Sequence, residues 1–229
     1  MTPLRAISLD LDDTLWPVWP AIRRAEAGLH DWLGRHAPAT AASGVAALRA
    51  HREAIVRDRP DLAHDLSALR RESIRRALAA AGDDPALAEP AFEVFFALRQ
   101  QVDLYDDVLP ALRRLSARFR VVALSNGNAD VARVPGLQGL FHAALSAQGL
   151  GWRKPQPEAF AAACAAAGCT PAEVLHVGDD GPADVDGALG AGLQAAWVVR
   201  ADLPAPPRPQ GQPRHVVADL AELADRLGA

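Results

Sequence analysis

Cysteine is scarce in this chain, with only Cys164 and Cys169 among 229 residues. Two thiols in an alanine-rich stretch give no disulfide framework, and they are typical of proteins from a reducing compartment. No apolar stretch approaches the roughly 20 residues that span a bilayer. Asp10 also interrupts the apolar run near the start, too early for a secretory signal. We therefore expect a cytoplasmic protein with no membrane partner.

A strong charge of either sign is also missing. The sequence holds 24 Lys and Arg against 28 Asp and Glu, so its formal net charge is −4. This balance gives no reason to expect nucleic acid or an anionic membrane as a partner. A Gly-x-x-x-x-Gly-Lys run is absent, which leaves a P-loop kinase without support. Half of the residues are hydrophobic, so the chain can bury a large core.

The chain divides into a helical part and a part with alternating strands and helices. Residues 16–102 contain apolar side chains at helical spacing. They predict four helices near 18–35, 40–57, 62–81 and 86–101. From Asp103 onward, apolar strands alternate with helices, and the strands are expected at 120–126, 143–147, 174–179, 195–199 and 215–218. The alternation predicts an α/β fold with a parallel sheet and helices on both faces.

Two carboxylates follow the first apolar strand. Asp10 and Asp12 come directly after the run Ala6–Leu9, and residues two apart point to the same side of an extended chain. One carboxylate can attack as a nucleophile while the other moves a proton, with a hard cation offsetting their repulsion. The alternative is a helix N-terminus, where these acids only cap backbone N–H groups.

Three further motifs follow in order along the chain. A second apolar strand ends in Ser125 and Asn126, and Lys154 precedes a helix that Pro155 or Pro157 can start. A third strand, predicted at 174–179, ends in an acidic stretch, which contains Asp179, Asp180 and Asp184. We interpret His176, inside that strand, as a core histidine whose hydrogen bonds are satisfied. Each motif is a weak signal alone, and the four together in this order are a strong one.

The four motifs resemble those of the haloacid dehalogenase-like (HAD) hydrolase superfamily, from residue 5 to about residue 200. The resemblance implies a Rossmann-like parallel-sheet core of residues 1–15 and 103–229, with an inserted C1-type helical cap of residues 16–102. It also implies a phosphatase that uses Mg²⁺ and an aspartyl-phosphate intermediate. Its substrate would be a small-molecule phosphate ester. Either a monomer or a homodimer is compatible with the alanine-rich helix surfaces.

The resemblance assigns the catalytic roles residue by residue. Asp10 would be the nucleophile and Asp12 the general acid and base, with Thr14 holding the loop by a hydrogen bond. Lys154 would neutralise charge on the nucleophile and on the phosphoryl group. Ser125 and the backbone N–H groups of Asn126 and Gly127 would bind the phosphoryl oxygens.

A magnesium site is implied by the same comparison. Asp10, the backbone carbonyl of Asp12 and Asp179 would hold the cation, which prefers a sparse set of oxygen ligands. Asp180 and Asp184 would orient the metal-bound waters and Lys154 without binding the cation directly. Capping and turn formation are the alternative explanation for each acid of this loop.

Within the superfamily, the sequence resembles the enterobacterial phosphatases that act on FMN and on 5-amino-6-(5-phospho-D-ribitylamino)uracil. Segments 10–15, 125–128 and 175–180 carry most of this similarity. If a flat ring is bound, Trp16, Trp19, His64 and Arg70 are candidates to line the pocket of the leaving group. Ordinary helix packing explains Trp19 equally well. Those relatives have tyrosine where this chain has Trp16.

Several other functions fit the same motifs. Sugar phosphates, phosphoglycolate and nucleotides are alternative substrates, and a phosphomutase would keep every residue of a phosphatase. A haloacid dehalogenase uses the same nucleophile on carbon, but it needs neither Asp12 nor the acidic loop. A catalytically silent phosphate-binding module is the non-enzymatic alternative.

Overall fold

The computed structural model describes residues 2–204 and 206–229, and it separates into two compact units. The first unit contains residues 1–17 and 103–229, and the second contains residues 18–102. The chain therefore leaves the first unit once and returns to it once. In the described part of the chain, no helix is long and apolar enough to cross a membrane.

The first unit is built on a parallel sheet of six strands in the order β3-β2-β1-β4-β5-β6. The strands are β1 (Ala6–Leu9), β2 (Arg120–Ser125), β3 (Ala143–Ser146), β4 (Val174–Gly178), β5 (Gln194–Val198) and β6 (His215–Val217). Strand β1 lies between β2 and β4, and Ser8 is in register with Val122 and His176. All residues of β1 and β4 are buried, as their continuous apolar sequences require in a parallel sheet. The predicted α/β class is confirmed.

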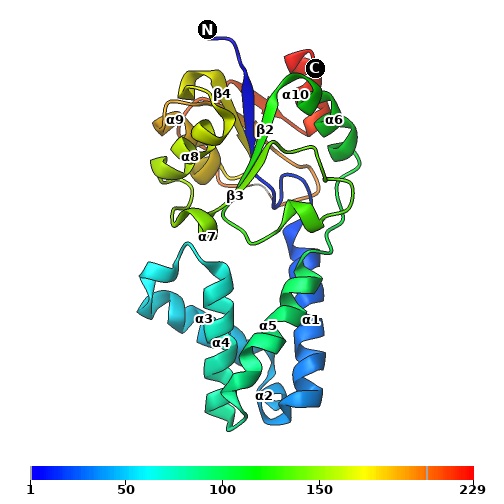
Figure 1. Cartoon of the computed structure of the whole chain (residues 1–229), viewed down its shortest axis with the longest axis vertical. Helices are drawn as coiled ribbons and strands as arrows, with labels where there is room; N and C mark the ends of the chain where they lie inside the picture. Colours follow the sequence, from blue (N-terminus) through cyan, green and yellow to red (C-terminus); the bar gives the residue numbers. More distant parts are fainter. Residues whose placement is uncertain (1, 205) are drawn as a thin grey trace. The chain divides into compact units, whose positions relative to one another are not determined.

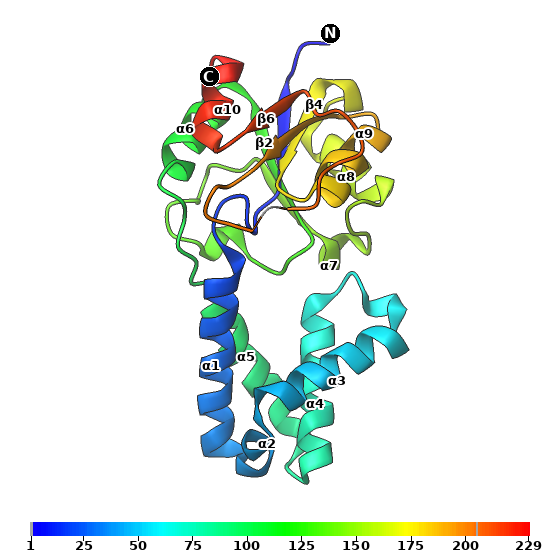
Figure 2. The same cartoon turned by 180° about the vertical axis from the view of Figure 1, so that it is seen from behind.

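Helices cover both faces of this sheet (Figures 1 and 2). Helices α6 (Val108–Arg118) and α10 (Leu220–Leu227) pack together on one face. On the other face, α8 (Pro157–Ala167) and α9 (Gly187–Gly190) enclose a core in which Phe160 is completely buried. The remaining short helices are α7 (Ala147–Leu150), a π-helical turn at Gly181–Asp186 and 3₁₀ turns at Val131–Arg133 and Pro171–Glu173.

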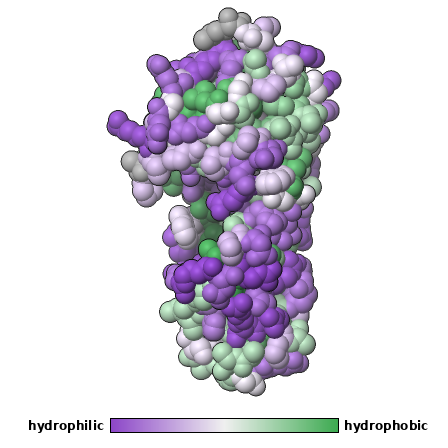
Figure 3. All heavy atoms as spheres, turned by 90° about the vertical axis from the view of Figure 1, so that its left-hand side faces the viewer, coloured by the Kyte–Doolittle hydropathy of each residue, from purple (hydrophilic) through white to green (hydrophobic). Residues whose placement is uncertain are grey.

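The second unit consists of helices only. It contains α1 (Val18–His36), α2 (Pro38–Ala42), α3 (Gly44–Asp58), α4 (Leu66–Ala81) and α5 (Ala88–Arg99), with 3₁₀ turns at Pro60–Leu62 and Pro85–Leu87. Helix α1 packs against α5, and α4 packs against both α3 and α5. Their apolar faces share a core that includes Leu29, Leu78, Phe92 and Phe95. Hydrophilic side chains gather over the middle of this unit on the face shown in Figure 3.

Local chemistry sets where these helices begin and end. The helix predicted at 40–57 is two helices, because Ser43 ends α2 and Gly44 adopts a φ of +78°, which a right-handed helix does not continue through. Helix α4 begins at Leu66, because the Asp65 carboxylate accepts the N–H of Ala68 at 2.8 Å. Helix α8 begins at Pro157, the later of the two prolines considered.

Candidate active site

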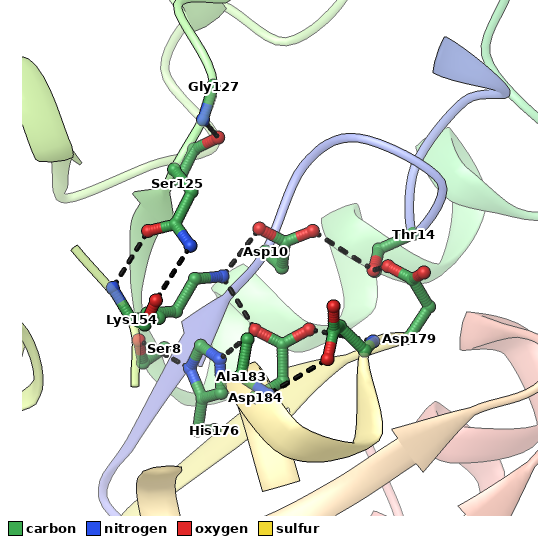
Figure 4. A network of polar contacts seen from close by, with 12 residues as sticks. Ser8, Asp10, Thr14, Ser125, Gly127, Lys154, His176, Asp179, Ala183 and Asp184 are labelled. Carbon is green, nitrogen blue, oxygen red and sulfur yellow. Dashed lines mark hydrogen bonds and ion pairs between the residues drawn. The ribbon is translucent and has the colours of Figure 1, made fainter. Parts of the chain in front are cut away.

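Four loops bring polar side chains to one edge of the sheet, where the carboxyl ends of its strands meet (Figure 4). Asp10 follows β1, Ser125 is the last residue of β2, and Asp179 follows β4. Lys154 comes from the loop before α8. Since β1, β2 and β4 are neighbours, adjacent strands deliver the residues of three motifs to one place.

Lys154 lies at the centre of this group. Its side chain is 2% exposed, and its Nζ lies 2.5 Å from Asp10 Oδ1 and 2.7 Å from Asp184 Oδ1. Burial would lower the pKa of Lys154, but the charges of Asp10 and Asp184 outweigh it and raise the pKa above the usual range. The lysine is therefore a fixed cation between two buried carboxylates.

The three acids have unequal pKa values. Burial, together with the charges of Asp184 and Asp179, raises the pKa of Asp10 well above its usual value, although Lys154 opposes the change. Burial and the charge of Asp184 raise the pKa of Asp179 to about 7. For Asp184, Lys154 and His176 outweigh the effect of burial and lower the pKa. With all three acids ionised, the group would hold more negative charge than one lysine neutralises.

These acids have the spacing of a cation site. Oxygen atoms of Asp10, Asp179 and Asp184 lie within 4.8 Å of one another. A divalent cation among them would offset the excess charge and favour their ionised forms. The Thr14 hydroxyl donates to Asp179 Oδ1 at 3.0 Å and lies 3.4 Å from Asp10 Oδ2, so it joins the first and last of these loops.

Asp184 is held on all sides by donors. His176 Nε2 lies 3.1 Å from Asp184 Oδ1, and the backbone N–H of Asp180 donates to Asp184 Oδ2 at 3.0 Å. His176 Nδ1 lies 3.0 Å from Ser8 Oγ, which confirms a buried histidine with both ring nitrogens engaged. These contacts leave Asp184 less able than Asp10 or Asp179 to bind a cation directly.

Asp180 helps to form the turn that presents Asp184. Its carboxylate accepts the N–H of Ala183 at 2.8 Å and caps the π-helical turn, and its expected role in orienting the metal-bound waters and Lys154 stays a prediction. Gly178 makes room for the side chain of Asp184, because a Cβ atom at this position would lie 2.2 Å from Asp184 Oδ2. The turn therefore depends on both residues to present Asp184.

The loop after β2 is hydrogen-bonded to the loop that contains Lys154. The Asn126 side chain donates to the carbonyl of Lys154 at 2.9 Å and accepts its N–H at 2.8 Å. The N–H of Gly127 donates to Ser125 Oγ at 2.9 Å. A Cβ atom on Gly127 would lie 2.4 Å from Asp12 Oδ2, so only glycine allows this backbone to approach Asp12 so closely.

Trp16 is placed differently from the expectation. Its side chain is fully buried, and its indole N–H donates to Asp12 Oδ1 at 2.8 Å. Asp13, between them in sequence, has a φ of +59°, which turns the chain so that this contact forms. Trp16 is therefore a partner of Asp12, and its ring offers no exposed face for stacking on a ligand.

Two supporting residues were missed by the sequence reading. The Trp197 indole donates to the carbonyl of Asp179 at 2.7 Å. The buried Arg200 donates to the carbonyl of Thr14 at 2.7 Å, and to Asp107 at 2.7 Å. Both residues are at the end of β5 or just beyond it. Their partners are distant in sequence, so no local pattern identifies them.

The other three residues predicted to select the substrate belong to the helical unit. Trp19 is 60% exposed, His64 is partly buried, and Arg70 contacts Glu26. Their role in substrate recognition stays a prediction.

Comparisons with known proteins agree with this site. Residues 4–192 match the family described as haloacid dehalogenase-like hydrolase. The chain is 32% identical over 199 residues to the 5-amino-6-(5-phospho-D-ribitylamino)uracil phosphatase YigB of Escherichia coli (strain K12), covering 85% of this chain and 83% of that protein. It is 33% identical to a phosphoserine phosphatase of Thermus thermophilus, covering 96% of this chain and 98% of that protein.

A solved structure is similar over nearly the whole length. The 2-haloacid dehalogenase from Pseudomonas syringae pv. Tomato DC3000 superimposes with a TM-score of 0.90 at 37% identity, covering 98% of each chain. The family match spans most of the chain, and two of the relatives named here are phosphatases. On this evidence, the chain belongs to the haloacid dehalogenase-like hydrolase family, as its four motifs predicted.

Proposed function

We propose that this protein is a Mg²⁺-dependent phosphatase that hydrolyses a small phosphate monoester through an aspartyl-phosphate on Asp10. The observation that carries the proposal is the buried contact between Asp10 and Lys154. Asp179 and Asp184 lie close to Asp10, and Asp12 follows it two positions later in the sequence. Phosphatases named for different substrates are among the similar proteins, and they support the reaction class.

The reaction follows from the roles of these side chains. An Asp10 oxygen attacks phosphorus, and the bond from phosphorus to the ester oxygen breaks. Asp12 gives its proton to that leaving oxygen. Water then attacks the phosphorus of the aspartyl-phosphate, Asp12 takes a proton from the water, and Asp10 is released with inorganic phosphate.

The surrounding groups stabilise charge during both steps. Lys154 offsets the charge of the nucleophile and of the transferring phosphoryl group. Ser125 and the backbone N–H groups of Asn126 and Gly127 bind phosphoryl oxygens in this proposal. The Gly127 N–H, which donates to Ser125 Oγ, would turn to the phosphoryl group when substrate binds.

Mg²⁺ is the cation that suits this donor set. Asp10, Asp179 and the backbone carbonyl of Asp12 would hold it, and Asp184 would orient Lys154. When bound, the cation offsets the charge of the acids and of the phosphoryl oxygens. We further propose that residues 18–102 act as the cap that selects the substrate, because the core motifs contact only the phosphoryl group.

The similarity to the ribitylaminouracil phosphatase favours that compound, or FMN, as the substrate. The relative named phosphoserine phosphatase, at similar identity, supports a phosphorylated amino acid instead. Sugar phosphates, phosphoglycolate and nucleotides complete the candidates, and a phosphomutase would use the same residues.

Dehalogenation of a 2-haloacid is the second candidate function, because a structure of that name is 37% identical. In that reaction the carboxylate of Asp10 would displace a halide from carbon, and no proton is needed by the leaving group. The hydrogen bond that fixes Asp12 and the cluster of Asp10, Asp179 and Asp184 would have no use there. Both features favour phosphoryl transfer.

The deciding experiment measures two products from one protein sample. Phosphate release is assayed with FMN, the ribitylaminouracil phosphate, phosphoserine, phosphoglycolate, nucleoside monophosphates and sugar phosphates. Chloride release is assayed with 2-chloropropionate. We expect phosphate release that needs Mg²⁺ and stops with EDTA, and no chloride release. Chloride release without phosphate release would replace the phosphatase proposal by the dehalogenase.

Replacing Trp16 by phenylalanine is expected to leave Asp12 less well placed to donate its proton. The variant keeps a buried aromatic ring but loses the N–H that fixes Asp12 Oδ1. A hydrogen bond to a charged group is worth about 1.5–3 kcal/mol, so we expect turnover of alkyl phosphates to fall about tenfold or more. Turnover of p-nitrophenyl phosphate, whose leaving group needs no proton, should fall less than about threefold.

The exposed Trp152 provides the control for this comparison, since it lies in the same unit and Trp152→Phe should change the turnover of neither ester. Equal losses on both kinds of ester in Trp16→Phe would mean that the indole supports only the loop's packing.

A further inference from the structure

The histidine of β4 is a buried titratable group that the proposed mechanism does not use. His176 is 1% exposed, and its ring meets the Phe160 ring edge-on, with centroids 5.1 Å apart. Its Nδ1 lies 3.0 Å from Ser8 Oγ, and its Nε2 lies 3.1 Å from Asp184 Oδ1 (Figure 4). Ser8 is the residue of β1 that is in register with His176. Two neighbouring strands and an aromatic ring therefore fix the imidazole in place.

The hydrogen bonds determine where the protons of this group lie. Against the effect of burial, Lys154 and His176 lower the pKa of Asp184, so its carboxylate is ionised at neutral pH and only accepts hydrogen bonds. Nε2 of His176 therefore carries a proton. Burial lowers the pKa of His176 although Asp184 opposes the change, so the ring is neutral and Nδ1 keeps its lone pair. The hydroxyl of Ser8 must then donate to Nδ1.

Asp184 needs a fixed donor because of where it lies. It belongs to the π-helical turn Gly181–Asp186, outside the strands of the sheet. Its Oδ1 also lies 2.7 Å from Lys154 Nζ, and that Nζ lies 2.5 Å from Asp10 Oδ1. A carboxylate rotates easily about its terminal bond, and an N–H group held by the sheet selects one orientation. His176 thus joins the rigid centre of the sheet to the ammonium group beside the nucleophile.

We propose that Ser8 and His176 are positioning residues of the active site. The Ser8 hydroxyl holds the neutral ring with its proton on Nε2, and the ring fixes Asp184. Asp184 in turn keeps the Lys154 ammonium group beside Asp10, where the attack on phosphorus needs it. The effect on turnover rests on the proposed phosphatase, whereas the fixed lysine can be measured without turnover.

The position of the proton is tested on the unchanged protein. A long-range ¹H–¹⁵N spectrum at pH 7.5 distinguishes a protonated ring nitrogen from an unprotonated one. The signals of His176 are identified by nuclear Overhauser contacts with the Phe160 ring. We expect a single tautomer, with the proton on Nε2. A proton on Nδ1, alone or together with one on Nε2, would overturn the proposal.

The lysine provides a second measurement, because Lys154 is the only lysine in the sequence. In protein labelled with ¹⁵N-lysine, the side-chain ammonium gives one signal, and burial between two carboxylates slows the exchange of its protons with water. We expect this signal in the wild-type protein and in His176→Gln, whose amide N–H reaches the place of Nε2. It should broaden beyond detection in His176→Asn, whose shorter amide reaches only the place of Nδ1. The exposed His142 gives the control, and His142→Gln should keep the signal.

Turnover should follow the lysine signal. In His176→Asn we expect kcat for phosphate release to fall about tenfold or more, since a hydrogen bond to a charged group is lost. The loss should appear in kcat more than in KM, because the positive charge is needed most as the phosphoryl group is transferred. His176→Gln should stay within about threefold of the wild type. Cys164→Ala, which opens a small cavity in the core that contains Phe160, should lower Tm and leave kcat unchanged.

Two further results would overturn the inference. The first is a lysine signal that persists in His176→Asn with kcat unchanged, which would leave His176 as a packing residue. The second is an equal fall of kcat in His176→Asn and His176→Gln, which would show that a donor at the place of Nε2 is not what the site requires. A protein that hydrolyses no ester but gives the expected tautomer and lysine signals would overturn the phosphatase proposal and support the fixed lysine.

Discussion

The Asp10→Asn variant is expected to lose turnover by about 10⁴-fold or more, as other enzymes do when their nucleophile is removed. An amide oxygen is a poor nucleophile and cannot form the mixed anhydride with phosphate. The assay is phosphate release at saturating substrate and Mg²⁺. Activity within about tenfold of the wild type would remove Asp10 from the mechanism.

The same variant is expected to be more stable than the wild type when no metal is added. The pKa of Asp10 is raised by burial and by the charges of Asp184 and Asp179, so its ionised form destabilises the folded protein at neutral pH. Asparagine removes this charge, and Lys154 keeps Asp184 as a partner at 2.7 Å. We expect a gain of about 1 kcal/mol, or about 3 °C in Tm, at pH 7.5 with EDTA.

The gain has a defined pH dependence. A carboxyl group whose pKa is raised on folding binds its proton more tightly in the folded protein, so its destabilising effect fades as the pH falls. The difference in Tm between Asp10→Asn and the wild type should therefore shrink between pH 7.5 and pH 5. The exposed Asp31 gives the control, since Asp31→Asn should show no such trend. A loss of stability in Asp10→Asn at pH 7.5 would contradict the charge balance described above.

Replacing Lys154 by methionine is expected to impair both activity and folding. Methionine has a similar length, but it leaves Asp10 and Asp184 buried together without their shared cation. Breaking a buried ion pair in this way typically costs about 3–5 kcal/mol. We expect Tm to fall by about 10 °C and turnover by about 10³-fold, because the attack on phosphorus also loses its fixed positive charge.

A double variant isolates the cause of this loss. Lys154→Met leaves Asp10 and Asp184 without a cation, and adding Asp184→Asn replaces one of these two carboxylates by a neutral amide. Part of the lost stability should return, whereas activity should not. Thermal unfolding followed by circular dichroism gives the four Tm values of the cycle. Strictly additive effects would show that Lys154 and Asp184 do not interact as their 2.7 Å contact implies.

The sequence predicts the sheet and the meeting point of its motifs because both depend on local patterns. Apolar runs such as Ala6–Leu9 read as buried strands, and parallel strands place their carboxyl ends at one edge. Asp10, Ser125 and Asp179 could therefore be expected together. The break at Ser43 and Gly44 was missed, since the helical spacing of the apolar residues continues across it.

The supports of the site depend on contacts that no local pattern encodes. Arg200 reaches Thr14 from 186 residues away, and the indole of Trp197 meets the backbone of Asp179. Trp16 was expected to face a ligand because it follows the catalytic loop. The left-handed backbone of Asp13 instead turns the chain so that the indole meets Asp12, and this turn has no clear mark in the sequence.

The pair of hydrogen bonds between Asn126 and the backbone of Lys154 has a consequence for the changes of length that this chain can tolerate. The bonds join the two ends of the segment 127–153, which includes β3 and α7, beside the reacting groups. The entropy of closing a loop grows only slowly with its length. Insertions near the exposed Gly139, for example, would lengthen the loop without displacing the hydroxyl of Ser125 or the amine of Lys154. One asparagine thus allows this segment to change length while Ser125 and Lys154 keep their places.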